Sequence, residues 1–314
     1  MRVIRHLDRC ADRFAAPVVT LGNFDGVHAG HQEILSRVVT QARERKSDSV
    51  VITFYPHPSV VLAPDRSSAA LMPLRDRLAR IREHGVGALV LKRFTRAFAT
   101  LEPEAFVERY LVARLGASKV IIGHSVNFGR GRRGNAATLE AAGARHGFAV
   151  EVVGPVEVDG IAVSSTEVRR RLTAGEVALA GRLLRRAYAV EGRVVEGDRR
   201  GRKLGFPTAN VRPRLAPLVP DGVYAVRVEW TERAGGRHHE HPGVANVGRN
   251  PTFGHGRERT LEPHLFDFDG NLYGERLRVS FIERLRGEMK FASVGALVDQ
   301  IAADAAEARR VLGV

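Results

Sequence analysis

Cysteine is almost absent from this sequence: Cys10 is the only one among 314 residues. The chain can therefore form no internal disulfide and no cysteine-rich zinc cluster. Long apolar stretches are missing too, since no run approaches the roughly 18 residues of a membrane-spanning helix. The opening segment MRVIRHLDRCADRF lacks the apolar core of a signal peptide. We therefore expect a cytoplasmic protein that does not cross a membrane.

Lysine is scarce as well, because only five of the 49 basic residues are lysine. Arginine thus carries almost all of the net charge of +14. Such a charge suits a partner that carries phosphate, either a nucleotide or a nucleic acid. The codon usage of an organism explains a preference for arginine equally well, so charge alone does not decide the function.

The remaining composition is that of a globular protein, with 44% hydrophobic and 27% charged residues. A chain of this length can form two domains, each with its own core. The hydrophobic pattern changes from helical to alternating near residue 185. We therefore predict two domains, residues 1–184 and residues 185–314.

In the first domain, short apolar segments alternate with helical patterns. The predicted strands are Val18–Leu21, Val50–Phe54, Ala88–Leu91, Lys119–Ile122 and Phe148–Val153. This alternation predicts a Rossmann-like α/β fold, with a parallel sheet and helices on both faces. Ligands of such sheets bind at the carboxyl ends of the strands. The loops at residues 22–31, 55–58 and 123–134 should therefore line one site.

In the second domain, apolar residues recur at every second position, which is typical of antiparallel strands. The predicted strands are Tyr188–Val195, Val223–Trp230, Thr260–Phe266 and Arg276–Leu285. The turn residues between them predict a small antiparallel β-barrel. An apolar stripe from Val294 to Leu312 predicts a C-terminal helix that covers this barrel.

The string GNFDGVHAGH after the first predicted strand combines a glycine loop with a helix start. Its candidate site residues are Gly22, Asn23, Asp25, Gly26, His28 and His31. Free backbone N–H groups and the positive end of a helix favour an anion at such a place. The two histidines add donors on the same side of the first helical turn. For the histidine pair alone, a turn with two solvated rings is the more frequent explanation, but the whole string favours a phosphate site.

Five separated motifs resemble those of one enzyme family, and they occur in the order of that family. GNFDGVHAGH, TFYPHP at residues 53–58 and SSTEVR at residues 164–169 resemble the FMN adenylyltransferase module. GRKLGFPTANV at residues 201–211 and LEPHLFDFDGNLYGERL at residues 261–277 resemble the riboflavin kinase module. The chain is thereby similar to the prokaryotic bifunctional riboflavin kinase/FAD synthetase family.

The resemblance implies two ATP-dependent reactions: phosphorylation of riboflavin to FMN, and adenylylation of FMN to FAD with release of pyrophosphate. The FMN phosphate is already ionised, so alignment and charge stabilisation matter more than a base in the second reaction. In the first reaction, the ribityl hydroxyl must lose a proton to a positioned carboxylate. The implied partners are small-molecule substrates and Mg²⁺, with no membrane; nucleic acid is not expected, and a homo-oligomer is left open.

By the resemblance, His28 and His31 are the catalytic residues of the first domain. We expect neutral imidazoles there, because a helix N-terminus lowers the pKa of a histidine. The implied ATP-binding residues are Gly22, Asn23, Asp25, Gly26, Ser165, Thr166 and Arg169, the last three on the opposite side of the triphosphate. The implied flavin-binding residues are Phe54, His57 and Pro58. Glu167 would place a negative charge near the phosphates.

In the second domain, the resemblance implies that Glu262 is the catalytic base. Gly205, Thr208 and Asn210 of the GFPTAN motif are implied ATP-binding residues. The oxygens of Thr208 and Asn210 are implied ligands of Mg²⁺, which prefers hard oxygen donors. Arg286 and Glu288 correspond to a flavin-binding segment that closes the site. Taken alone, Glu262 would be one outward-facing strand residue.

One loop departs from the family pattern. Ser125 and Val126 stand where an acid or amide and an aromatic residue are usual. Asn127 could supply the missing amide to the flavin site, since alternate residues of a strand face the same side. The following GRGRRG, residues 129–134, is interpreted as a mobile basic loop near the phosphates. A dinucleotide fingerprint and an RNA-binding tract are weaker interpretations of it.

Two motifs that resemble metal sites are set aside. Residues 267–271, DFDGN, lack the later spacing and the terminal glutamate of a calcium loop, so we interpret them as a hairpin turn. Residues 238–241, HHEH, fall in an expected polar loop after two glycines. A histidine-rich tract is only a compositional hint of metal binding.

Two other functions compete with the bifunctional enzyme. The altered loop would suit a riboflavin kinase whose first domain no longer makes FAD. The charge and the GRGRRG string would suit an arginine-rich nucleic-acid-binding regulator, whose binding should weaken steeply with salt. The intact GFPTAN motif, Glu262 and both histidines argue against the regulator as the principal function.

Overall fold

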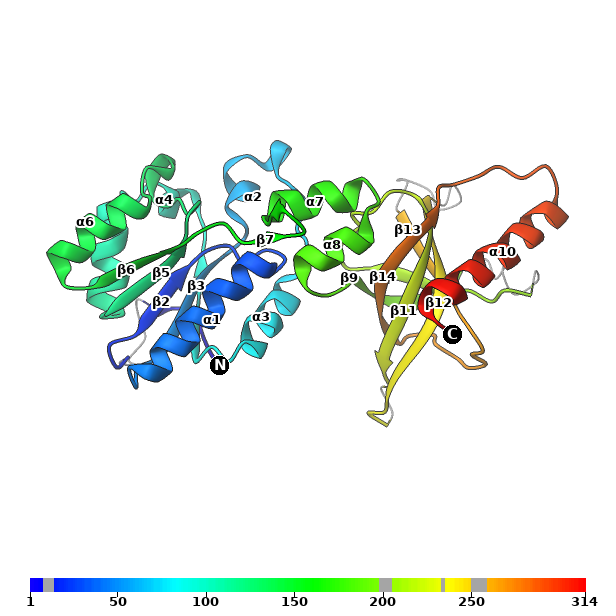
Figure 1. The fold of residues 1–314 in the computed structure, drawn as a ribbon, viewed down its shortest axis with the longest axis horizontal. Helices are drawn as coiled ribbons and strands as arrows, with labels where there is room; N and C mark the ends of the chain where they lie inside the picture. Colours follow the sequence, from blue (N-terminus) through cyan, green and yellow to red (C-terminus); the bar gives the residue numbers. More distant parts are fainter. Residues whose placement is uncertain (8–13, 198–204, 233–234, 250–258) are drawn as a thin grey trace. The chain divides into compact units, whose positions relative to one another are not determined.

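The computed structural model describes residues 1–7, 14–197, 205–232, 235–249 and 259–314 (Figure 1). The chain divides into two compact units, Met1–Ser165 and Thr166–Val314. The predicted domain boundary after residue 184 falls inside the second unit. Cys10 and residues 201–204, which begin the GRKLGFPTANV motif, lie outside the described residues.

The first unit is built on a six-stranded parallel sheet. Its strands are β1 (Arg2–Ile4), β2 (Val18–Leu21), β3 (Ser49–Tyr55), β4 (Ala88–Arg93), β5 (Lys119–Gly123) and β6 (Ala149–Val153). Their order is β1-β4-β3-β2-β5-β6, and every neighbouring pair is parallel. The predicted parallel sheet is confirmed, with β1 as an additional strand. Only Ile4 of β1 is buried, so this strand has no hydrophobic pattern to reveal it.

Helices cover both faces of the sheet, as predicted. On one face lie α1 (Ala29–Glu44) and α3 (Leu74–Glu83), whose Leu35 and Ile81 share a core cluster with Leu89 of β4. On the other face lie α5 (Pro103–Phe106), the π-helical turn Val107–Arg114 and α6 (Ala136–His146). The shorter elements are α2 (Pro58–Leu62), α4 (Arg96–Ala99), the 3-10 turns Pro64–Arg66 and Arg130–Arg132, and the paired strands β7 (Glu157–Val158) and β8 (Ile161–Ala162).

The second unit is built on a closed six-stranded barrel, in agreement with the prediction. Its strands are β9 (Tyr188–Val195), β10 (Asn210–Pro213), β11 (Gly222–Thr231), β12 (His238–Arg249), β13 (Arg259–Leu265) and β14 (Arg276–Arg286). All neighbouring pairs are antiparallel, in the order β10-β13-β12-β11-β14-β9. Helices α7 (Ser165–Thr173) and α8 (Val177–Leu184) precede the barrel, and α8 packs on β9 and β14. The sequence pattern predicts neither β10 nor β12.

The interpretation of HHEH as a polar loop is wrong. These residues begin β12 and pair with the end of β11. The rings of His239 and His241 stack on Trp230, with centroids 4.7 Å and 5.3 Å away. Stacking on an aromatic face stabilises these polar residues in a strand. A hydrophobic pattern alone does not predict that strand.

The interpretation of DFDGN as a hairpin turn is also wrong. β13 pairs with β10 and β12, whereas β14 pairs with β9 and β11. The segment therefore joins two strands that are not neighbours in the barrel. The sequence shows the two strands but not the order in which the barrel closes.

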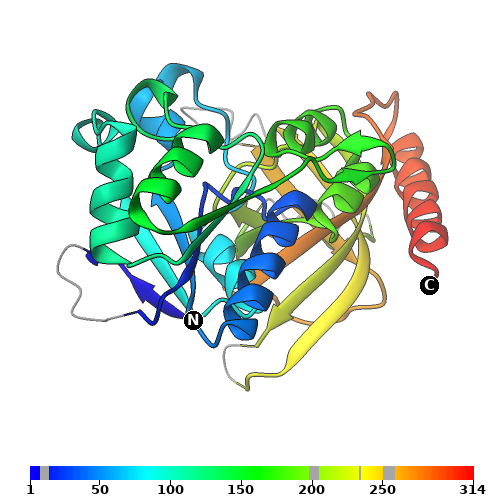
Figure 2. The same ribbon diagram turned by 60° about the vertical axis from the view of Figure 1, so that its left-hand side comes forward.

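The C-terminal helix α10 (Val294–Leu312) lies on the outside of the barrel, as predicted (Figures 1 and 2). Its Ala308 and Leu312 share a core cluster with Val223 of β11. The predicted apolar stripe does not pack along its whole length, because Val294 is 65% exposed. No helix within the described ranges has both the length and the apolar character needed to cross a membrane.

Asp304 anchors α10 to the barrel. This carboxylate is 6% exposed and accepts hydrogen bonds from Nε and Nη2 of Arg286, at 2.9 Å and 2.7 Å. Removing one partner of such a pair leaves a largely buried charge without compensation. We therefore expect Asp304→Asn to lower the free energy of unfolding of the barrel by roughly 3 kcal/mol.

Urea unfolding followed by the fluorescence of Trp230, the single tryptophan of the chain, measures this change. Glu307→Gln is the matched control, since it breaks the exposed Glu307–Arg310 pair of the same helix. This control should leave the free energy of unfolding close to the wild-type value, because solvent screens an exposed ion pair. Equal effects of the two substitutions would show that the Arg286–Asp304 pair does not hold the helix.

Candidate active sites

The loop between β2 and α1 holds a strained backbone. Phe24 and Val27 have φ angles of 51° and 41°, which non-glycine residues rarely adopt. Both side chains are 1% exposed, so packing holds the backbone in this form. Strain of this kind persists only where the surroundings impose it, and it is concentrated at functional sites.

Asp25 ties this loop to its surroundings. Its carboxylate is 4% exposed, and both oxygens lie 3.1 Å from the backbone nitrogen of Leu71, which donates to them. The backbone oxygen of Asp25 accepts a hydrogen bond from Oγ of Ser165 at 2.9 Å. The structure thus brings Asp25 and Ser165 together, and it uses the Asp25 carboxylate to shape the loop.

His28 and His31 stack on each other at the start of α1. Their ring centroids are 3.7 Å apart, at an interplanar angle of 20°. Nδ1 of His28 caps the helix by accepting from the backbone N–H of His31 at 3.4 Å. Because Nδ1 accepts this bond, Nε2 is the donor nitrogen of a neutral His28 ring.

The His31 ring favours its neutral form. Burial, the neighbouring His28 and the Arg77 cation lower its pKa well below 6.5, in that order of importance. Its Nδ1 is shielded from solvent and has no hydrogen-bond partner within the described residues. This agrees with the expected neutral imidazole at His31.

Arg77 is a residue of this site that sequence reasoning missed. It is 5% exposed, and it donates to the backbone oxygen of Asn23 at 2.7 Å and to that of Phe54 at 3.1 Å. The sequence does contain a signal for this residue. Arg77 lies three residues after Leu74 and four before Ile81 on α3. It therefore occupies the apolar stripe, where an arginine is unusual.

The predicted flavin residues end β3 and begin α2. Phe54 is 9% exposed and contacts the rings of Phe94 and Phe98, with centroids 6.0 Å and 5.9 Å away. His57 caps α2, and its Nδ1 lies 2.7 Å from Oγ of Ser59. Pro58 is the first residue of the helix. The carboxyl end of β3 therefore presents an aromatic wall beside a fixed histidine, and the flavin-binding role of these residues stays a prediction.

The altered loop after β5 is a turn. The strand ends at Gly123, and the Val126 N–H donates to the Gly123 backbone oxygen at 3.0 Å. The argument from strand alternation for Asn127 is therefore wrong. The exposed amide of Asn127 donates to the backbone oxygen of Ser125 at 3.0 Å, and its flavin role stays a prediction.

The GRGRRG loop makes specific contacts in this structure, and its mobility stays a prediction. An antiparallel bridge joins Phe128 to Gly134 at its two ends. Arg130 and Arg133 both form ion pairs with Glu102. This carboxylate balances part of the basic charge of the loop, which weakens the interpretation of the loop as a nucleic-acid-binding tract.

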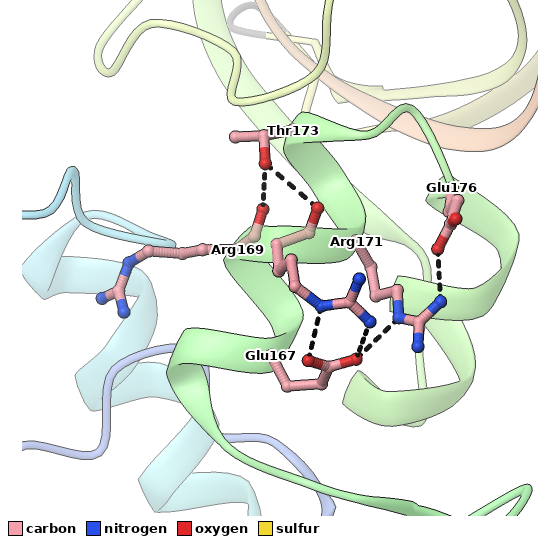
Figure 3. Close-up of polar contacts among 6 residues, drawn as sticks. Glu167, Arg169, Arg171, Thr173 and Glu176 are labelled. Atoms are coloured by element: carbon pink, nitrogen blue, oxygen red, sulfur yellow. Dashed lines mark hydrogen bonds and ion pairs between the residues drawn. The ribbon is translucent and has the colours of Figure 1, made fainter.

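The charge of Glu167 on α7 is neutralised within its own helix. Its carboxylate accepts hydrogen bonds from Arg170 and Arg171, and these bonds lower its pKa to about 2. Figure 3 shows this network, with the Arg169 side chain extending from another side of α7. Glu167 therefore adds no unbalanced negative charge beside Thr166 and Arg169, whose ATP-binding role stays a prediction.

In the barrel, strand register brings three polar residues into one row. Glu262 of β13 lies opposite Asn246 of β12. On the other side of β13, Val211 of β10 lies opposite Leu261. Because these strands are antiparallel, Asn210 then lies opposite Glu262. The neighbours Leu261 and Val211 point into the barrel, being 0% and 3% exposed. Asn246, Glu262 and Asn210 therefore share the outer face, and Asn246 is a second residue that sequence reasoning missed.

The GFPTAN segment is held beside this row. Nδ1 of His264 lies 2.8 Å from the backbone oxygen of Pro207. The amide of Asn210 lies directly over Gly197, where a Cβ atom would come within 2.2 Å of its Nδ2. Only glycine leaves room for the amide in this position. Thr208, two residues before Asn210, is exposed.

The predicted closing segment lies next to the same row. A Cβ atom added to Gly248 would lie 2.8 Å from Oε1 of Glu288 and 3.2 Å from Nδ2 of Asn246. Glu288 therefore lies near the Asn246 end of the row. The Arg286 guanidinium is paired with Asp304 of α10 and positions the helix in this structure, and its flavin-binding role stays a prediction.

No cluster of three or more histidine, cysteine, aspartate or glutamate residues in the described part of the chain could hold a metal ion. The oxygens of Thr208 and Asn210 are the remaining candidate donors. The candidate kinase site thus offers a carboxylate and several neutral oxygens, which suits a hard cation shared with a phosphate chain.

Comparison with known proteins matches the two halves of the chain to two different family models. A family model described as FAD synthetase matches residues 12–167, and one described as riboflavin kinase matches residues 184–312. The bifunctional riboflavin kinase/FMN adenylyltransferase of Pseudomonas fluorescens is 40% identical over 98% of this chain and 97% of its own length. The enzyme of the same name from Escherichia coli K12 is 39% identical over 94% of this chain and 93% of its own length.

A solved structure has the same architecture throughout. It is titled a macrolide-efflux protein from Streptococcus pneumoniae, and it is 32% identical with a TM-score of 0.85 over 98% of both chains. That title describes the other protein, whereas both family models and the enzyme relatives concern flavin chemistry. The chain belongs to the bifunctional riboflavin kinase/FMN adenylyltransferase family.

Proposed function

We propose that this chain phosphorylates riboflavin with ATP to give FMN and ADP, and then adenylylates FMN with a second ATP to give FAD and pyrophosphate. The observation that carries the proposal is the match of one family model to each half of the chain. We assign the adenylyltransferase to residues 1–184 and the kinase to residues 185–314, in a cytoplasmic enzyme.

In adenylyl transfer, an oxygen of the FMN phosphate attacks the α-phosphorus of ATP. A new phosphorus–oxygen bond forms as the bond to the β-phosphate breaks and pyrophosphate leaves. The nucleophile is already ionised, so this chain must bind, align and stabilise charge. Neutral His28 and His31 at the start of α1 are suited to donate hydrogen bonds to the phosphate oxygens. The strained loop before them adds backbone N–H groups.

In the kinase reaction, the ribityl hydroxyl of riboflavin attacks the γ-phosphorus of ATP. Glu262 accepts the hydroxyl proton as the new bond forms and ADP leaves. The amides of Asn210 and Asn246 on either side of Glu262 would orient the carboxylate and the phosphate chain. We place Glu288 at the flavin end of this row, and Arg286 behind it as the anchor of α10.

Thr208 and Asn210 would hold Mg²⁺ in the kinase site. Their hydroxyl and amide oxygens are hard donors two residues apart, and Mg²⁺ commonly takes few protein ligands beside water and substrate phosphates. The ion, when bound, neutralises charge on the phosphate chain. The chain itself contributes the fixed position of the Asn210 amide over Gly197.

The first test is a stepwise product assay with separated sites. The wild-type chain with riboflavin, ATP and Mg²⁺ should give FMN and then FAD, separated by chromatography. We expect His28→Ala to stop FAD formation from supplied FMN while riboflavin phosphorylation continues. Glu262→Gln should lower the phosphorylation rate by about 10²- to 10⁴-fold and leave FMN adenylylation intact.

Each outcome of this assay is informative. Accumulation of FMN without FAD would support the alternative of a kinase with an impaired first domain. The formation of neither product would end the proposal. A folded variant that loses both activities would contradict the assignment of the two reactions to separate sites.

The second test uses the close approach of Gly197 to Asn210. A Cβ atom in Gly197→Ala would displace the Asn210 amide, so we expect riboflavin phosphorylation to fall by roughly tenfold or more. FMN adenylylation should not change. Gly181→Ala in α8 is the control, because its Cβ atom meets nothing closer than 3.5 Å. An unaffected kinase rate in Gly197→Ala would remove Asn210 from the site.

The third test concerns Mg²⁺. Thr208→Val removes one proposed ligand oxygen and keeps the shape of the side chain. We expect the Mg²⁺ concentration for half-maximal riboflavin phosphorylation to rise by about tenfold or more. Thr231→Val, at the exposed end of β11, is the control. If both variants keep the wild-type Mg²⁺ dependence, Thr208 is not a ligand.

A further inference from the structure

Arg77 carries a buried positive charge that no carboxylate neutralises directly. Burial of a guanidinium costs several kcal/mol unless its donors are satisfied. Nη1 and Nη2 of Arg77 donate to backbone oxygens, while Nε is buried without a partner among the described residues. Arg77 forms no ion pair with a described residue, and Asp25 is the acidic group whose charge favours its ionised form. A buried charge of this kind is not expected to stabilise the fold by itself.

The two carbonyls that Arg77 holds belong to the ends of neighbouring strands. Asn23 follows β2, and Phe54 lies near the end of β3. Oγ1 of Thr53 also donates to the Asn23 oxygen, at 3.2 Å. Arg77 therefore joins the glycine loop to the predicted flavin wall at the edge where ligands of a parallel sheet bind.

The contact at Asn23 also fixes the direction of a backbone donor. In a trans peptide, the N–H points opposite to the carbonyl of the preceding residue. Because the Asn23 carbonyl points at Arg77, the Phe24 N–H points away from it. This N–H donates no hydrogen bond to a described residue. Phe24 is 1% exposed, so this N–H is a buried backbone donor of the glycine loop that faces away from Arg77.

We propose that Arg77 is a positioning residue for adenylyl transfer: it orients the Asn23–Phe24 peptide toward the phosphates of ATP and places a fixed positive charge behind the loop. The inference rests on the proposed function. Arg77 also acts on His31, because its positive charge opposes protonation of the His31 ring. His28 and Arg77 both oppose protonation of the His31 ring, while Asp25 lies in the same loop.

The test compares Arg77→Met, Arg77→Lys and the control Arg80→Met in the full-length chain. Arg80 lies one turn along α3 and pairs with Glu83 at the surface. We expect Arg77→Met to lower kcat/KM for FAD formation from FMN by roughly 10- to 100-fold. Riboflavin phosphorylation, in the other unit, should be unchanged in every variant. Arg77→Lys keeps the charge but lacks the planar fork whose two nitrogens bond the two carbonyls, so its loss should be intermediate.

The pH profile separates positioning from a merely structural role. Without the cation, the pKa of His31 rises, so the acid limb of FAD formation should move to higher pH in Arg77→Met. The acid limb should keep its wild-type position in Arg77→Lys, even at a lower plateau. This variant keeps the test decisive if Arg77→Met does not fold.

An unchanged kcat/KM in folded Arg77→Met would overturn the inference. A shifted acid limb in Arg77→Lys, equal to that in Arg77→Met, would overturn the role of the charge. Failure of the proposed function would look different, because the wild-type chain itself would then form no FAD.

Discussion

The parallel sheet of the first unit imposes the constraint on which its site depends: the carboxyl ends of all its strands meet at one edge. Residues distant in sequence, such as Asn23 and Phe54, become neighbours there, and Arg77 binds the backbone of both. The loop after β2 is held in part by Phe24 and Val27, which pack in the core. Buried polar contacts of Asp25 and Arg77 hold it as well, so the fold and the candidate chemistry share the same hydrogen bonds.

The barrel reaches a comparable result through strand register. Antiparallel pairing places Asn210, Glu262 and Asn246 in one row on the outer face, although they come from three strands. A slip of one residue in β13 would turn Glu262 into the barrel and Leu261 out of it. The hydrophobic interior thus fixes the candidate base, because only one register buries Leu261 and its neighbours.

Much of this architecture follows from the sequence. Long apolar patterns show five strands of the sheet and four of the barrel, while β1, β10 and β12 are too short or too polar to be recognised. The closing order of the barrel is not local information, which is why DFDGN resembles a hairpin turn. The motifs identify candidate residues such as His28 and Glu262. Arg77 and Asn246 belong to none of the five family motifs, and only tertiary packing and register reveal their neighbours.

The two candidate sites use charge in opposite ways. Adenylyl transfer starts from an ionised phosphate, so a proton acceptor would add nothing, and histidine donors near a buried arginine suit the accumulating negative charge. Phosphorylation of a hydroxyl needs a proton acceptor, so a carboxylate held among neutral amides suits it. A cation such as Arg77 beside Glu262 would stabilise the ionised carboxylate and weaken it as a base. Two separate cores therefore allow both environments to exist in one chain.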